Sequence, residues 1–126
     1  MDKKTFKKEE RLCSKKVIEQ MFAIGQSTLS FPIKAVYLNN SSHHEGIPLQ
    51  AAFTVPKRLF KRAPKRNLLK RRMRESYRLN KKELLGITDQ LSVMFIYISK
   101  DELPYDKIDA AMKKAMIKIR KSLVNE

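Results

Sequence analysis

Basic residues are concentrated in one segment of the chain, where thirteen Lys and Arg lie between Lys57 and Lys82 and Glu75 alone opposes them. This segment holds nearly half of the 28 basic residues of the chain. A guanidinium group offers phosphate a planar pair of donors that an ammonium group cannot match. The chemistry that these residue types indicate is therefore binding of a polyanion with a phosphate backbone.

The spacing of these residues predicts one charged face on a helix over about residues 65–85. At 100° per residue, one side of that helix carries Asn67, Arg71, Arg74 and Arg78, flanked by Lys70 and Lys81. The other side carries residues suited to packing against a sheet, which are Leu69, Met73, Ser76, Tyr77 and Leu84. A helix that is merely solvated usually interleaves charges of both signs, so this stripe favours a binding surface.

The composition places this segment in a small, strongly basic protein. A chain of 126 residues with 42% hydrophobic residues fits a single folded domain over residues 1–126. A net charge of +15 indicates a polyanionic partner, with nucleic acid ahead of an anionic membrane surface. No apolar run approaches a membrane span, and the first residues lack the apolar core of a signal peptide. Cys13 is the only cysteine, so we expect no internal disulfide and a cytoplasmic location. The free protein is expected to be a monomer.

The remaining sequence predicts the elements that position the basic helix. Helices are expected over residues 14–24, with Ser14 as the N-cap, and over residues 106–124. Strands are expected over residues 31–38, 49–55 and 91–99, and the pattern leaves room for one further short strand. The basic residues 1–12 are expected to be mobile or loosely docked. This order predicts an α+β fold, with the basic helix in a strand–helix–strand crossover.

The basic helix resembles the signature of a known family. Its residues Arg66-Asn67-x-x-Lys70-Arg71-x-x-Arg74-Glu75 are similar to those of the bacterial ribonuclease P protein component. The order of elements on both sides agrees with that family. The sequence departs from the family pattern at Leu68, where the usual Arg-Asn-Arg has its second arginine. The resemblance therefore does not imply a phosphate contact at this position, while Arg71, Arg72 and Arg74 keep the local charge.

The resemblance implies a fold and a function. The fold is a two-layer sandwich of a four-stranded mixed sheet and three helices. The function is that of the protein subunit of ribonuclease P, a ribonucleoprotein endonuclease that removes the 5′ leader of precursor tRNA. The RNA subunit is expected to carry the active site and to bind the Mg²⁺ that the reaction needs. The chain itself is expected to supply no catalytic residue and to hold no metal or cofactor.

The resemblance also implies two sets of binding residues. The first set contacts RNA through the basic helix and the preceding loop, and consists of Lys57, Arg58, Lys61, Arg62, Arg66, Asn67, Lys70, Arg71, Arg72, Arg74 and Arg78. The second set contacts the single-stranded leader in a cleft between the first helix and the sheet, and consists of Ile18, Phe22, Phe31, Tyr37 and Phe53. Aromatic rings suit single strands because every base has a π face. For Ile18 and Phe22, as for Tyr37 and Phe53, burial in the core is the alternative.

Other functional classes remain as alternatives. A ribosomal or RNA-chaperone type of RNA-binding protein would share the charge without any role in cleavage. A protein-only nuclease would need carboxylates beside the basic surface, and Glu75 alone is insufficient. A DNA-reading helix would be accompanied by a second helix or a zipper, and neither pattern is present. His43 and His44 are adjacent in a polar loop and lack a third ligand, so we predict no metal site there.

Overall fold

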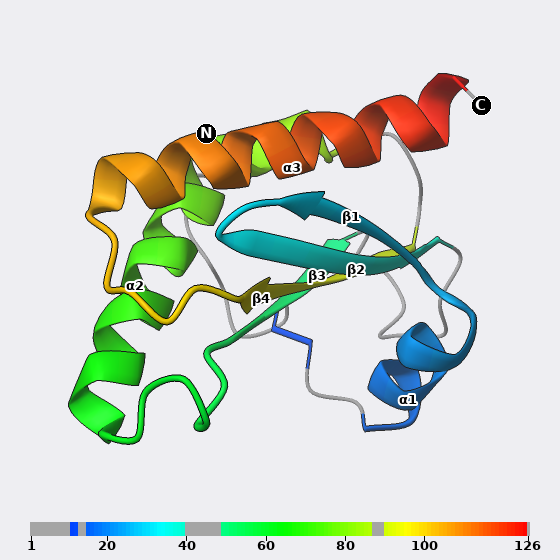
Figure 1. Cartoon of the computed structure of the whole chain (residues 1–126). Helices are drawn as coiled ribbons and strands as arrows, with labels where there is room; N and C mark the ends of the chain where they lie inside the picture. The colour runs from blue at the N-terminus through cyan, green and yellow to red at the C-terminus, as the bar shows by residue number, and fades with distance from the viewer. Residues whose placement is uncertain (1–10, 13–14, 40–48, 87–89, 126) are drawn as a thin grey trace.

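Figure 1 shows a computed structural model of the chain, which describes residues 11–12, 15–39, 49–86 and 90–125. Its elements are α1 (Lys15–Ile24), β1 (Gln26–Ser30), β2 (Ile33–Asn39), β3 (Leu49–Thr54), α2 (Ala63–Asn80), the 3-10 helix η2 (Lys81–Glu83), β4 (Leu91–Tyr97) and α3 (Tyr105–Asn125). The predicted α+β class, the three helices and the three predicted strands are confirmed. The fourth strand is β1, which the sequence pattern did not locate.

The four strands form one mixed sheet in the order β1-β2-β4-β3. The pairs β1–β2 and β2–β4 are antiparallel, whereas β3 and β4 are parallel. Parallel neighbours need a crossover connection, and α2 provides it. The basic helix therefore lies in the predicted strand–helix–strand crossover, beside the sheet in Figure 1.

The main core lies between one face of the sheet and the helices α2 and α3. Alternate strand residues point to this face, such as Ile33 and Ala35 of β2 and Val93 and Phe95 of β4. The helix α3 contributes an apolar stripe, with Ile108, Ala111, Met112, Ala115 and Ile119 all buried. Gly86, with a φ of 83°, follows α2 and η2 in a backbone conformation that glycine adopts readily.

The opposite face of the sheet is partly covered by α1. Val17 and Met21 of α1 pack with Val36 of β2 and Met94 of β4 in a second, smaller cluster. Leu12 joins this cluster, and its backbone N–H donates a 2.9 Å hydrogen bond to the carbonyl oxygen of Ala51. The described end of the segment predicted to be mobile or loosely docked, Arg11 and Leu12, therefore lies against β3, while residues 1–10 lie outside the described residues. Cys13, Ser14, His43 and His44 also lie outside them.

Candidate RNA interface

The two sides of α2 differ as the sequence predicted. Leu69, Met73, Ser76 and Tyr77 are buried against the sheet and α3. Asn67, Arg71 and Arg74 are exposed on the other side. Pro64 lies in the first turn of α2, where its missing N–H leaves no hydrogen bond unmade. The helix therefore presents a polar stripe to solvent on a rigid, well-packed support.

The cations of α2 divide into two groups according to their partners within the protein. The side chains of Lys70, Arg71 and Arg74 form no hydrogen bond or ion pair with any other described residue. Arg78 instead binds Glu75 through two hydrogen bonds of 3.1 and 2.6 Å. The hydrogen bond from Arg78 lowers the pKa of the Glu75 carboxyl below its usual value, although partial desolvation opposes this. An RNA phosphate at Arg78 would have to compete with that carboxylate, so Lys70, Arg71 and Arg74 are the cations most available for binding.

Two further arginines of the predicted RNA-binding set hold loops in place. The guanidinium of Arg66 donates 2.8 Å hydrogen bonds to the carbonyl oxygens of Phe60 and Lys61. The guanidinium of Arg72 donates a 2.6 Å hydrogen bond to the carbonyl oxygen of Leu103 and lies 3.5 Å from Glu102. Both side chains are half-buried. These hydrogen bonds tie the loops that flank α2 to the helix.

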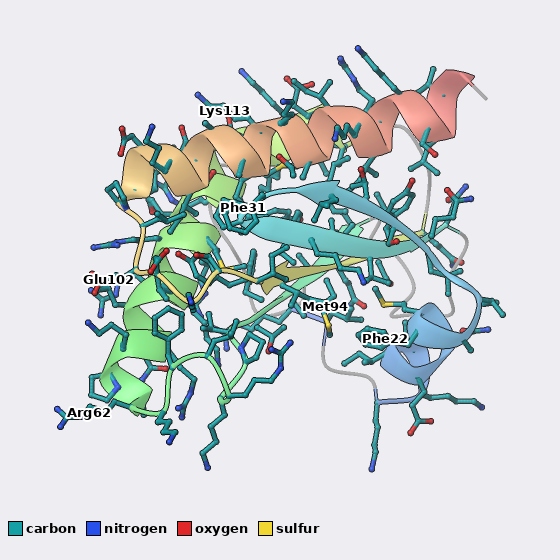
Figure 2. All side chains as sticks on the ribbon, in the orientation of Figure 1. Phe22, Phe31, Arg62, Met94, Glu102 and Lys113 are labelled. Carbon is teal, nitrogen blue, oxygen red and sulfur yellow. The ribbon has the colours of Figure 1, made fainter. Side chains whose placement is uncertain are left out.

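The loop before α2 extends the basic surface beyond the helix. Four exposed cations on this loop have side chains that form no hydrogen bond or ion pair with other described residues, and they are Lys57, Arg58, Lys61 and Arg62. Phe60 anchors the loop because its ring packs against the ring of Tyr97, with 5.9 Å between the ring centroids. Figure 2 shows Arg62 at the outer end of α2. The loop and the exposed side of α2 together form one basic surface.

A groove at the edge of the sheet brings a further cation to this surface. It has a volume of about 460 Å³, and Arg11, Lys70, Arg74 and Phe53 are among the residues that line it. Arg11 reaches this place because it pairs with Ala51 in a parallel β-bridge at the edge of β3. Sequence reasoning missed Arg11, which is 46 residues from the first cation of the basic segment and gives no local signal of its position. Three cations from two distant segments therefore converge on one groove.

The α1 side of the molecule carries the other candidate surface. Phe22 is 59% exposed, although it is a large apolar residue. Ile18, one helical turn away, is half-buried against the second cluster. Figure 2 shows Phe22 and Met94 on the same side of the sheet, away from α3. These residues provide an apolar surface with an exposed aromatic ring.

The structure corrects the placement of Tyr37 and Phe53. Tyr37 is 4% exposed, points to the main core and donates a 3.0 Å hydrogen bond to Ser122 of α3. The ring of Phe53 stacks on that of Phe95, with 5.6 Å between ring centroids. It meets the ring of Tyr77 edge-on, with 5.5 Å between centroids, also on the α2 side of the sheet. Neither ring shares a face of the sheet with Phe22. Core burial is therefore the outcome for Tyr37, whereas Phe53 is partly buried against the core and also lines the groove beside Lys70.

Phe31 also lies apart from the α1 surface. It occupies the turn between β1 and β2 and is 65% exposed. The α1 helix leads directly into the start of β1, so the whole length of that strand separates Phe31 from α1. Phe31 lines a different groove, beside α3. The predicted cleft of five residues is thus reduced to Ile18 and Phe22 on one surface.

Two general features of the described residues bear on the class of site. Among them, no three His, Cys, Asp or Glu side chains gather closely enough to hold a metal ion. Over the same residues, no helix combines the length and the apolar character that crossing a membrane requires.

Comparison with known proteins gives concordant results. The family model for ribonuclease P matches residues 6–120. The ribonuclease P protein component of Porphyromonas gingivalis is 35% identical over 117 residues, which cover 89% of this chain and 84% of that protein. The corresponding protein of Petrotoga mobilis is 32% identical over 103 residues, which cover 82% of this chain and 79% of that protein.

Solved structures share the fold. The RNase P protein of Staphylococcus aureus matches with a TM-score of 0.71 at 19% identity, covering 94% of this chain and 100% of that chain. The RNase P protein from Thermotoga maritima matches with a TM-score of 0.69 at 19% identity, covering 86% of this chain and 96% of that chain.

Proposed function

This chain belongs to the ribonuclease P protein family of tRNA-processing components, and we propose that its basic surface binds the RNA subunit while its α1 surface binds the 5′ leader of precursor tRNA. The observation that carries the first part is the stripe of Asn67, Arg71 and Arg74. It faces solvent on a rigid helix, and the cations of the stripe have no protein partner among the described residues. Cations that the protein does not neutralise itself are the ones that a phosphate backbone can engage.

The groove beside β3 gives this surface a specific geometry. Arg11 and Arg74 each offer a planar fork of donors, and Lys70 adds a point charge between α2 and the sheet. A phosphate entering the groove would be approached from the strand edge and from the helix at once. Asn67, one turn before Arg71, adds an amide that can donate to a phosphate or read a base edge.

The α1 surface supports the second part of the proposal. The exposed ring of Phe22 offers a stacking platform for an unpaired base, with Ile18 as an apolar neighbour. It lies across the sheet from the helix α3. The RNA subunit and the leader would therefore be held on separate surfaces, and the protein would fix their relative position.

In this proposal the chemical step belongs to the RNA. Bound Mg²⁺ in the RNA subunit supplies the phosphodiester chemistry. The protein acts by neutralising phosphates near the junction of the two RNAs, which reduces their repulsion and the Mg²⁺ concentration needed for assembly. Its own groups bind and orient, and none of them transfers a proton.

Reconstitution tests the proposal. Purified protein, a bacterial ribonuclease P RNA and a precursor tRNA are combined at a Mg²⁺ concentration where the RNA alone is inactive. We expect cleavage at the 5′ junction with both subunits present, and none with protein alone. The double variant Arg71→Glu/Arg74→Glu should lose the stimulation, whereas Lys121→Glu, on the exposed side of α3, should retain it.

Two outcomes would contradict this function. Cleavage at the 5′ junction by RNA-free protein would place the active site in the chain itself. Failure to stimulate any bacterial ribonuclease P RNA, together with tight binding to ribosomal RNA, would instead support a general RNA-binding protein without a role in cleavage.

A further inference from the structure

A second groove lies between the β1–β2 turn and α3, away from both surfaces described above. It has a volume of about 580 Å³, compared with about 460 Å³ for the groove beside α2. Leu29, Phe31 and Pro32 form its strand side. Its helix side consists of the small residues Ala110 and Ala111 and three lysines, Lys107, Lys114 and Lys118. Figure 2 shows Phe31 at the tip of the hairpin, beneath α3.

The charge of this groove has one sign. No carboxylate is among its lining residues. Lys118 donates a 2.8 Å hydrogen bond to the carbonyl oxygen of Leu29, which ties α3 to the hairpin. Lys107 and Lys114 are exposed, and their ammonium groups form no hydrogen bond or ion pair with another described residue. The neighbouring carboxylate of Glu102 is held by Lys65 at 2.7 Å, so it does not neutralise them.

The apolar part of the groove is open to solvent. Phe31 is 65% exposed and Leu29 is 57% exposed, although large apolar side chains are usually buried. Phe31 is absent from the main core and from the second cluster. An exposed aromatic ring beside unpaired cations is the combination that proteins use to stack a base and hold its phosphates.

We propose that this groove binds a short single-stranded segment of RNA, with a base stacked on Phe31 and the adjoining phosphates on Lys107 and Lys114. The two lysines are seven residues apart, which separates them by about 10 Å along α3. That span suits the backbone of a few nucleotides. The site is distinct from the α1 surface, because β1 separates Phe31 from α1, and it does not depend on how the α2 surface is used.

The test uses the full-length protein with Arg71→Glu/Arg74→Glu, so that the basic helix no longer dominates binding. The probe is a fluorescent hexaadenylate, titrated by anisotropy, and amide shifts are followed by ¹H–¹⁵N NMR. We expect saturable binding with shifts in residues 29–33 and 107–118. Phe31→Ala should weaken binding at this groove, followed through the shifts of residues 29–33, about five- to 150-fold, as loss of one stacked base does. Lys107→Ala/Lys114→Ala should weaken binding and flatten its salt dependence.

Matched controls separate the groove from general charge and apolar character. Phe22→Ala removes a ring of similar exposure on the other side of the sheet and should leave hexaadenylate shifts at residues 29–33 unchanged. Lys82→Ala/Lys121→Ala removes two exposed cations elsewhere.

Three results would overturn the proposal. One is shifts confined to α1 and α2. Another is equal binding of tripolyphosphate and hexaadenylate with no effect of Phe31→Ala, which would indicate a simple anion site. The third is tighter binding of an acidic, aromatic peptide than of hexaadenylate, which would indicate a protein partner. Each of these is compatible with full stimulation of cleavage, so the two proposals fail independently.

Discussion

The hydroxyl of Ser76 on α2 donates a 2.6 Å hydrogen bond to the Oδ1 atom of Asp109 on α3. The same carboxylate accepts a hydrogen bond from Asn80 at 3.2 Å and pairs with Lys113 at 3.2 Å. Asp109 therefore joins the two long helices, α2 and α3. The basic surface is therefore held on the sheet partly through one carboxylate.

This carboxylate gives a prediction about stability and pH. Burial raises the pKa of Asp109, but the hydrogen bond from Ser76 and the charge of Lys113 outweigh it and hold that pKa below its usual value. A lowered pKa in the folded state stabilises the protein above the unfolded pKa of about 4, and this contribution is lost as pH falls through the folded value.

Asp109→Ala should therefore reduce the free energy of unfolding by about 1–3 kcal/mol at neutral pH, and by less below about pH 4. Urea denaturation of both proteins across this pH range checks it. Asp106→Ala, in the exposed first turn of α3, is the matched control and should cost less. Parallel unfolding curves for wild type and Asp109→Ala at every pH would show that the carboxylate does not act through its charge.

Adjacent arginines of α2 should behave differently when each is replaced. Arg72 donates to the carbonyl oxygen of Leu103, so Arg72→Ala leaves that acceptor without its partner and should destabilise the fold by about 1–3 kcal/mol. Arg71 is exposed, so Arg71→Ala should change stability by about 0.5 kcal/mol or less. Thermal unfolding of the two variants is a direct comparison. Equal losses of stability would contradict the division of the arginines into supporting and RNA-facing groups.

The salt dependence of RNA binding should report the exposed stripe. Arg71→Ala and Arg74→Ala should each lower the slope of log affinity against log salt by about one unit, because each removes one phosphate contact. Arg11→Ala should do the same if the groove beside β3 receives a phosphate. Filter binding to the RNA subunit at several salt concentrations measures these slopes, with Lys121→Ala as the control. An unchanged slope in all three variants would mean that the stripe faces away from the RNA.

The aromatic residues of the sheet faces should separate into binding and core residues. Phe22→Ala should weaken binding of precursor tRNA with a leader by about five- to 150-fold and leave binding of mature tRNA nearly constant. Tyr37→Ala should instead lower the unfolding temperature, because it removes a buried ring and its bond to Ser122. The measurements are substrate affinity in the assembled enzyme and circular dichroism. If Phe22→Ala weakened both substrates equally, the α1 surface would not distinguish the leader.

Gly25 should be intolerant of a side chain. A Cβ atom there would lie 2.4 Å from the carbonyl oxygen of Met21 and 2.8 Å from that of Tyr37, both on the backbone. Gly25→Ala should therefore displace the end of α1 from β2, and should weaken leader binding as well as stability. Gly86→Ala, at a positive φ with open space around it, should cost stability without affecting leader binding. A Gly25→Ala protein with wild-type leader affinity would argue against a role for α1 position.

Local patterns predicted the helices, three of the strands and the two sides of α2, because those signals are carried by neighbouring residues. The strand β1 escaped detection because Gln-Ser-Thr-Leu-Ser has one large apolar residue and depends on pairing with β2. The sequence could not predict toward which face of the sheet Tyr37 points. Its neighbours Ala35 and Val36 point to opposite faces and are both apolar, because both faces of β2 are covered. The supporting role of Arg72 depends on Leu103, which lies 31 residues away in the chain.

The unequal coverage of the two sheet faces has a consequence for local unfolding. Twenty buried residues hold α2 and α3 to one face, whereas the described buried cluster beneath α1 consists of Leu12, Val17, Met21, Val36 and Met94. Cooperative units with few buried contacts open at a lower free energy than the whole molecule. Amide hydrogens of α1 should thus exchange with solvent faster than those of β4. A ligand bound at Phe22 would slow that exchange. The surface proposed to bind the leader is therefore also the part of the molecule that binding would order.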